Sequence, residues 1–213
     1  MDGHAYLKIF VALYVLLNPL EGLPIFLART QNLQPRVRLN IGRTAALAVT
    51  CIMLVAVAAG RGVLQLFSIS IGDLTTAGGI IIFLIAFKMV LGPSGAGDSS
   101  TPMSPEELRR FGIVPLATPL LAGPGVISAV IVYASQGPTG QGNTLLEDVI
   151  LSGIIVAVGV ATGIALRAAS LLKRLLGETG IDVSTRISGI LVAAIAAGMI
   201  VQGVKQCFPV LAH

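Results

Sequence analysis

The chain has 213 residues, of which 54% are hydrophobic and 11% are charged, and its mean hydropathy is +0.90. A soluble domain is typically about 25% charged, so this composition excludes a soluble globule. The two cysteines, Cys51 and Cys207, are too few for a disulfide framework, and a net charge of +4 is weak support for nucleic-acid binding. We therefore interpret the chain as an integral membrane protein whose partner is the lipid bilayer and not a nucleic acid.

Six apolar runs recur along the chain, and each reaches membrane-spanning length once its flanking residues are included. A helical span needs about 20 apolar residues. Continuous apolar runs favour helices, because the strands of a membrane barrel would alternate apolar and polar residues. The runs cover residues 7–27, 44–60, 74–87, 111–134, 149–166 and 187–204. The sequence therefore predicts an all-α integral membrane protein with six transmembrane helices.

Lysine and arginine are distributed unequally between the two sides of these spans. An even number of spans places both termini on one side, and the side richer in basic residues faces the cytoplasm. Eleven basic residues fall on one side and three on the other. The eleven are Arg29, Arg36, Arg38, Arg43, Lys88, Arg109, Arg110, Arg167, Lys173, Arg174 and Arg186; the three are Lys8, Arg61 and Lys205. We predict that both termini lie outside the cytoplasm, and that Arg61 is an anchor that reaches toward the lipid headgroups.

Two boundaries between the runs carry local signals. Asp73 precedes the third run and is followed by two threonines, which favours Asp73 as the N-cap of that helix. Residues 173–184 are basic and contain Gly177, a composition typical of a turn. We therefore expect the sixth span to begin near Asp182 or Ser184.

Small residues mark two helix faces as surfaces for close packing. Gly78 and Gly79 are adjacent in the third run, and Gly159 and Gly163 are four residues apart in the fifth. Small residues let two membrane helices approach closely. The sequence therefore predicts close helix contacts at both places.

A proline-containing phrase occurs twice, one hundred residues apart, in the first and the fourth apolar runs. A proline inside a helix removes a backbone donor and clashes with the preceding turn, so a continuous helix would break or kink there. Asn18 and Thr118 are suited to be N-caps, with Pro19 and Pro119 at the first position of a new half-helix. The copies read Asn18-Pro19-Leu20-Glu21-Gly22-Leu23-Pro24 and Thr118-Pro119-Leu120-Leu121-Ala122-Gly123-Pro124. We therefore expect spans one and four to be broken at mid-membrane.

A matched pair of broken helices favours a binding cavity. Lipid cannot satisfy the backbone groups that a break frees, so a break is tolerated where it is buried in protein or lines a cavity. Two breaks in corresponding places indicate the binding site of a transporter. The alternative is a pair of ordinary proline kinks that neighbouring helices repair without any ligand.

The third and sixth spans also match one another, at an offset of 110 residues. The matched residues are Gly78-Gly79-Ile80 with Ser188-Gly189-Ile190, Ala86 with Ala196, and Met89 with Met199. Each half holds three spans, so the second half enters the membrane from the opposite side, as in inverted-repeat transporters. The predicted units are a first repeat at 1–92, a cytoplasmic linker at 93–110 and an inverted second repeat at 111–213. For spans three and six, chance recurrence of small apolar residues is a competing explanation.

Inversion makes the two half-helices begin near mid-membrane and run toward opposite faces, so their positive ends converge. Free amides at a helix start attract carboxylates and other anions, and glycine leaves room for a ligand near the backbone. We expect a small-molecule substrate with a carboxylate or comparable anionic group. The predicted substrate-binding residues are Asn18, Pro19, Leu20, Glu21, Gly22, Thr118, Pro119, Leu120, Ala122, Gly123, Gly125 and Arg186.

Two charged members of this set have structural alternatives. Glu21 stands at the third helical position after Asn18, where it can bond back to the Asn18 amide as in a capping box. An acidic group at membrane depth is also a functional candidate. Arg186 begins the sixth run and either reaches the lipid headgroups or points inward toward the site.

These motifs resemble the MarC family of bacterial inner-membrane proteins, also described as small neutral amino acid transporters. The resemblance covers nearly the whole chain. It is carried by Asn18-Pro19 with Gly22 and Pro24, by 71–79, by 114–120 with 122–125, and by Thr185-Arg186-Ile187 with Gly189. It implies six spans, a location in the bacterial inner membrane, and transport of amino acids the size of glycine or alanine. Glu21 departs from the neutral residue that is usual in the family, which argues against a universal role in proton coupling.

The leading hypothesis is a secondary transporter of small neutral amino acids, with alternating access between the two halves. Alternatives are an exporter of another small metabolite or ion, and an accessory membrane protein that transports nothing. An enzyme is not expected, because the only histidines, His4 and His213, lie at the termini. No phosphate-binding loop for ATP is present. We expect no cofactor or metal; a coupling proton or sodium ion, the direction of transport and the oligomeric state stay open.

Overall fold

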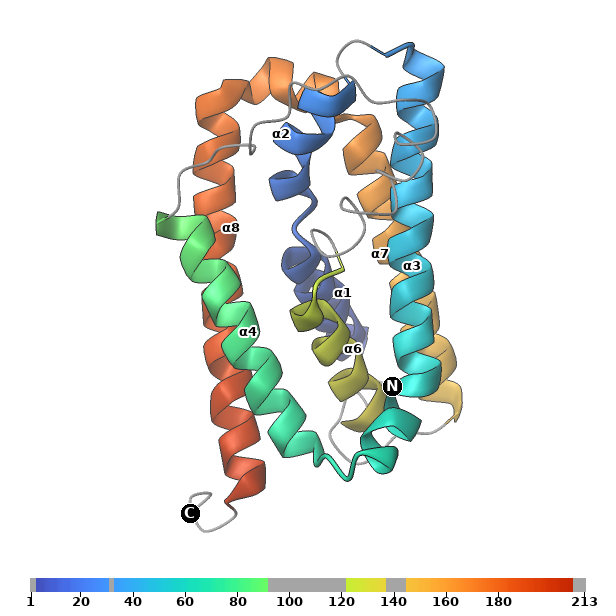
Figure 1. The fold of residues 1–213 in the computed structure, drawn as a ribbon, viewed down its shortest axis with the longest axis vertical. Coiled ribbons are helices and arrows are strands. Elements are labelled where there is room, and N and C mark those ends of the chain that lie inside the picture. Colours follow the sequence, from blue (N-terminus) through green and yellow to red (C-terminus); the bar gives the residue numbers. More distant parts are fainter. Residues whose placement is uncertain (1–2, 31–32, 92–121, 137–144, 209–213) are drawn as a thin grey trace.

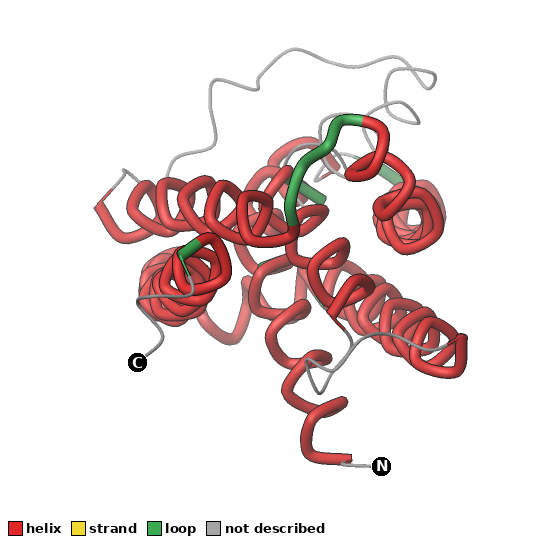
Figure 2. The backbone as a smooth tube through the Cα atoms, turned by 90° about the horizontal axis from the view of Figure 1, so that it is seen from below, coloured by secondary structure: helices red, strands yellow, loops and turns green. Residues whose placement is uncertain are grey.

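The computed structural model describes residues 3–30, 33–91, 122–136 and 145–208, and nearly all of these residues are helical (Figure 1). Figure 2 shows the same bundle from below, with helix as the regular structure throughout the described part. The helices are α1 (Gly3–Leu17), α2 (Pro19–Thr30), α3 (Pro35–Leu66), α4 (Ile71–Leu91), α6 (Pro124–Gln136), α7 (Leu145–Arg167) and α8 (Ala169–Cys207).

Four of the described helices are long and apolar enough to cross a membrane. They are α3, α4, the segment Leu146–Arg167 of α7 and the segment Thr179–Cys207 of α8. The apolar helices His4–Leu17 and Pro124–Gln136 are shorter. The prediction of a helical membrane protein is confirmed. The first predicted span corresponds to α1 with α2, and the fourth is described only from residue 122 onward.

The helices pack as two pairs with the interrupted elements between them. Helices α4 and α8 are in contact along much of their length, and α3 packs against α7. Helices α1, α2 and α6 lie between the pairs and contact members of both (Figure 1). The larger hydrophobic core is built around this middle layer, where Leu13, Leu17, Leu23, Phe26 and Val130 are fully buried. The region where α1 passes into α2 is therefore buried, whereas the first half of α1 is partly exposed, as at Leu7 and Val11.

Glycine produces the close approach within both pairs. A side-chain carbon added at Gly79 of α4 would lie 3.0 Å from the Ala196 carbonyl of α8, and one added at Gly159 of α7 would overlap Thr50 of α3. One added at Gly163 would lie 3.3 Å from Ala46 of α3. The predicted close contacts at both glycine-containing faces are thus confirmed.

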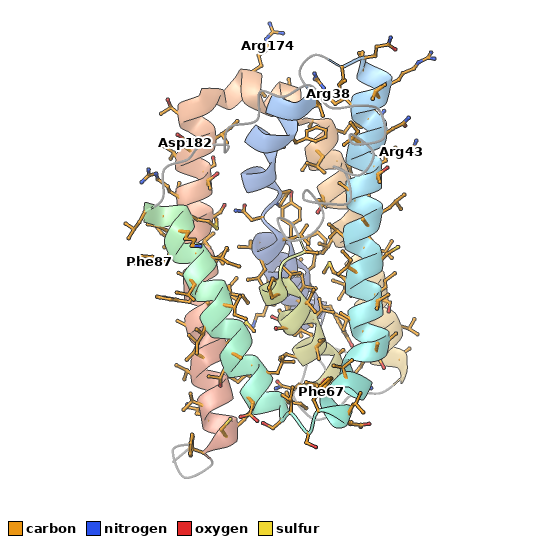
Figure 3. All side chains as sticks on the ribbon, in the orientation of Figure 1. Arg38, Arg43, Phe67, Phe87, Arg174 and Asp182 are labelled. Carbon is orange, nitrogen blue, oxygen red and sulfur yellow. The ribbon has the colours of Figure 1, made fainter. Side chains whose placement is uncertain are left out.

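Successive helices run in alternating directions along the bundle. In Figure 1, α1 and α2 run upward, α3 downward and α4 upward, whereas α6 runs downward, α7 upward and α8 downward. The start of α1 and the end of α8 therefore both lie toward the lower end of the bundle. Arg38, Arg43 and Arg174 project at the upper end (Figure 3).

Both predicted boundaries differ from the structure. Helix α4 begins at Ile71, and Ser70 is its N-cap: the Asp73 amide donates to Ser70 Oγ at 3.1 Å and the Ser70 amide donates to Asp73 Oδ2 at 3.3 Å. This reciprocal pair is a capping box, so Asp73 is its third-position partner and not the cap itself. The predicted turn at 173–184 is narrower in the structure: two helical segments of α8 meet at a kink at Gly177 (φ 67°, ψ −178°), a conformation that glycine adopts readily. The apolar span after the kink begins at Thr179, before Asp182 and Ser184.

Candidate functional site

The first helix break lies where the phrase predicted it. Helix α1 ends at Leu17, α2 begins at Pro19, and Asn18 between them has a left-handed backbone with φ 40°. The Asn18 amide donates to the Tyr14 carbonyl at 3.1 Å. Such a bond, made by a left-handed residue directly after the last helical residue, is a common way for a helix to end. Asn18 therefore ends α1 as well as preceding α2. An ordinary N-cap has an extended backbone, which Asn18 does not have. A right-handed helical backbone is disfavoured at Asn18, because the ring of Pro19 would clash with it.

The Asn18 side chain is buried and weakly bonded. Only 5% of the residue is exposed, and Nδ2 donates to the sulfur of Met89 in α4 at 3.7 Å. A thioether is a weak acceptor, whereas an amide nitrogen carries two donor hydrogens. The carboxamide can therefore donate to a stronger acceptor, such as a carboxylate, at the point where α2 begins.

The start of α6 differs from the prediction. Helix α6 begins at Pro124, and Ala122 and Gly123 before it are buried but not helical. The Gly123 carbonyl accepts the first helical bond, from the Ile127 amide at 3.2 Å, which makes Gly123 the N-cap. The predicted continuous half-helix from Pro119 to 134 is therefore wrong. The physical reason is Pro124, which suits the first helical position and excludes helical backbone in the residue before it.

One face of α4 contacts both the break at Asn18 and the start of α6. Met89 contacts Asn18, and a side chain added at Gly125, in the first turn of α6, would overlap Ile82. Ile82 and Met89 are both buried and are seven residues apart, so they share a helix face about 10 Å apart along the axis. The structure thus brings the starts of α2 and α6 to neighbouring positions on α4.

The other predicted residues are placed as follows. Pro19 and Gly22 are buried in the first turns of α2, and Leu20 and Glu21 lie in the same helical segment. Thr118, Pro119 and Leu120 lie outside the described residues. Within the described part, no group of three or more His, Cys, Asp or Glu side chains could hold a metal ion. The binding role of the predicted residues stays a prediction.

Arg186 lies on the exposed surface of α8. Its Nη1 donates to the Val90 carbonyl at 3.0 Å, in the last turn of α4. A cation is favourable at that end of a helix. This contact supports a structural role for Arg186, and we leave it out of the site proposed below.

Two other arginines contact helix ends that the sequence did not connect with them. Arg61, expected to reach the lipid headgroups, instead pairs with Asp148 Oδ1 at 3.1 Å and donates to the Ala134 carbonyl in the last turn of α6. Arg38 donates from Nε and Nη2 to the Thr30 carbonyl, at 3.3 and 3.0 Å. Sequence reasoning missed these contacts because each joins residues from different helices. It also missed Ile82, which carries no polar signal.

Comparisons with known proteins agree on one family. Residues 3–208 match the family described as MarC family integral membrane protein. The chain is 37% identical to the UPF0056 membrane protein YhcE of Escherichia coli K12, over 98% of this chain and 95% of that protein. It is 34% identical to the UPF0056 inner membrane protein YhgN of the same strain, over 92% and 94%. It is 33% identical to a UPF0056 membrane protein of Buchnera aphidicola, over 100% and 97%. No solved structure matches the chain.

Proposed function

This chain belongs to the MarC family of integral membrane proteins, and from that premise we propose that it is a secondary transporter of small neutral amino acids, the size of glycine or alanine. One observation carries the proposal. The helix starts at Pro19 and Pro124 lie against the same buried face of α4, through Met89 and Ile82. The substrate carboxylate would bind between these starts.

The electrostatics of the two starts favour a carboxylate. The first amides of each helix have no intrahelical acceptor, and together they carry about half a positive charge. In the water-poor interior of a membrane protein such a charge is weakly screened. The Asn18 carboxamide adds a buried donor whose described acceptor is only a thioether. The two starts with Asn18 therefore suit one small anionic group.

The scarcity of other polar groups supports a small substrate. The buried polar side chains of the described residues are Asn18, Thr30, Thr75, Ser128 and Thr162. All three threonines bond back to a carbonyl of their own helix, so their hydroxyl hydrogens are already used. Among these described side chains, a substrate with a long polar side chain would find few partners.

Equivalent glycines at the close contact between α4 and α8 support the inverted repeat. A side chain added at Gly79 would meet the Ala196 carbonyl and Ile200, and one added at Gly189 would meet the Ala86 carbonyl and Val90. Adding 110 to Gly79, Ala86 and Val90 gives Gly189, Ala196 and Ile200. Because α4 and α8 run in opposite directions, a contact at one position has a counterpart at the exchanged position in any such pair. The feature that favours a repeat is that glycine occupies both equivalent positions of close approach, Gly79 and Gly189.

The distribution of arginine residues indicates the orientation in the membrane. We place the protein in the bacterial inner membrane with the arginine-rich upper end of Figure 3 in the cytoplasm and both termini on the other side. Helices α2 and α6 then run from mid-membrane toward opposite faces (Figure 1). Access would alternate as the packing around the two breaks changes.

Uptake into liposomes by the purified full-length protein tests the function. We expect saturable uptake of glycine and alanine, competition by amino acids with a free carboxylate, and little competition by glycinamide or alaninamide. Imposed proton and sodium gradients, applied separately, identify the coupling ion. Absence of uptake for every small neutral amino acid would overturn the proposal. Equal competition by the amides would overturn the role of the helix starts.

A further inference from the structure

Helix α3 carries an arginine toward each of its ends, and each binds the far end of one half-helix. Arg38 donates twice to the carbonyl of Thr30, the last residue of α2, at 3.0 and 3.3 Å. Arg61 donates to the Ala134 carbonyl in the last turn of α6. A single helix thus holds the two segments whose starts form the proposed substrate site.

These contacts meet a specific physical need. The last four carbonyls of a helix have no intrahelical donor, and together they carry about half a negative charge. Thr30 and Ala134 are both buried, so water has little access to their carbonyls. A guanidinium supplies a permanent positive charge and several donors in a fixed plane, and Arg38 places two of them on one oxygen. Each arginine therefore satisfies and neutralises the negative end of a half-helix.

We propose that Arg38 and Arg61 are positioning residues of the substrate site, acting through α2 and α6. By fixing the far ends to α3, they determine where the two helix starts lie relative to one another. By neutralising the negative ends, they leave the positive ends dominant at the site. The helices have 12 and 13 residues, so each transmits a shift at its far end over about 20 Å. This inference rests on the proposed function.

Asp148 completes the contact at Arg61. Its carboxylate lies in the first turn of α7, where a negative charge is favourable, and pairs with Arg61 Nη2 at 3.1 Å. Arg61 therefore joins α3, α6 and α7 at one end of the bundle, whereas Arg38 joins α3 and α2 at the other. The two half-helices are held at opposite ends of the same scaffold.

Glutamine and lysine variants of both arginines test the proposal in liposomes, with Arg43→Gln as the matched control. Arg43 lies on α3 and is exposed, so this variant makes the same charge change on the same helix. We expect Arg38→Gln and Arg61→Gln each to raise the KM for glycine or alanine about two- to fivefold, the factor that corresponds to a helix-end charge. The lysine variants should have a KM between those of the wild type and the glutamine variants, since lysine keeps the positive charge but lacks the planar set of donors of a guanidinium. Arg43→Gln should keep the wild-type KM.

A purely structural role predicts a different result. In that case the glutamine variants would lower the melting temperature or the maximal rate and leave KM unchanged, which would overturn the proposal. The lysine variants keep the test available if a glutamine variant fails to fold. An equal KM increase in Arg43→Gln would also overturn it, because the effect would then follow from net charge.

Hydrogen exchange tests whether Arg38 and Arg61 anchor the ends of α2 and α6, independently of whether the protein transports amino acids. Amides in residues 27–30 should exchange faster in Arg38→Gln, and amides in 132–136 faster in Arg61→Gln, with no substrate present. Unchanged exchange would overturn the anchoring even if the protein transports amino acids. Absence of saturable transport by the wild-type protein, with exchange changed as expected, would instead overturn the proposed function and the positioning role while leaving the anchoring in place.

Discussion

The two copies of the proline phrase have the same spacing but begin their helices at different prolines. Helix α2 begins at the first proline, Pro19, and continues through Pro24, whereas α6 begins at the second proline, Pro124. The residue before the second proline differs: it is Leu23 in the first copy and Gly123 in the second. Leu23 is fully buried in the main core. Its packing offsets the strain of an internal proline, and Gly123 has no side chain that could do the same.

This difference makes the proposed site asymmetric. At the start of α2, Asn18 presents a side-chain donor and a left-handed backbone. At the start of α6, Ala122, Gly123 and Gly125 present mainly backbone. A substrate would therefore find a side-chain donor on one side and backbone amides on the other.

Adding bulk at Gly125 should have the largest effect. Valine there would overlap Ile82, and overpacking of this kind typically costs about 1–3 kcal/mol. Because the overlap lies in the first turn of α6, we expect Gly125→Val to abolish uptake. Ile82→Ala in the same protein should restore part of it. Gly153→Val is the matched control, since a side chain there meets nothing within 4 Å; loss of uptake in the control as well would contradict the explanation.

Leu23→Gly should make the first copy of the proline phrase behave like the second, with its helix beginning at the second proline. Removing a buried leucine side chain costs about 2–5 kcal/mol, and glycine also weakens the helix. We expect α2 to begin at Pro24, so amides 22 and 23 should exchange rapidly while those after residue 27 stay protected. Leu23→Met, which keeps the volume, should leave exchange as in the wild type. Protection retained at residues 22 and 23 in the glycine variant would mean that packing of Leu23 does not decide the helix start.

Asn18 allows its backbone and side-chain roles to be measured separately. Glycine adopts the left-handed conformation readily, whereas alanine meets a penalty of about 1–2 kcal/mol. Asn18→Gly should therefore fold normally but bind substrate less well, because it lacks the carboxamide. Asn18→Ala should lose stability in addition. Thermal unfolding and the KM for alanine distinguish the two effects, and a wild-type KM in Asn18→Gly would remove the side chain from the site.

The sequence predicted the parts of the fold that depend on neighbouring residues. A proline at position 19 is enough to break a helix, and an apolar run is enough to indicate a membrane helix, so both were recognised from composition and spacing. The start of α6 was misplaced because the choice between Pro119 and Pro124 depends on packing against other helices. The contacts of Arg38 and Arg61 could not be predicted for a similar reason. Arg61 and Ala134 are 73 residues apart, and only the assembled bundle brings them together.

Met89→Leu should have the smallest effect, and it tests whether the sulfur competes with the substrate. Leucine has nearly the same volume, so stability should change by less than about 1.5 kcal/mol. Its side chain cannot accept the Asn18 hydrogen, which leaves the carboxamide available to a carboxylate. Because the bond to sulfur is weak, we expect the KM for alanine to fall only about twofold. Met53→Leu, which changes a fully buried methionine of α3, is the matched control and should leave the KM unchanged. A higher KM in Met89→Leu alone would mean that the sulfur holds Asn18 in its binding orientation, and that the first break depends on α4 as closely as the second depends on Ile82.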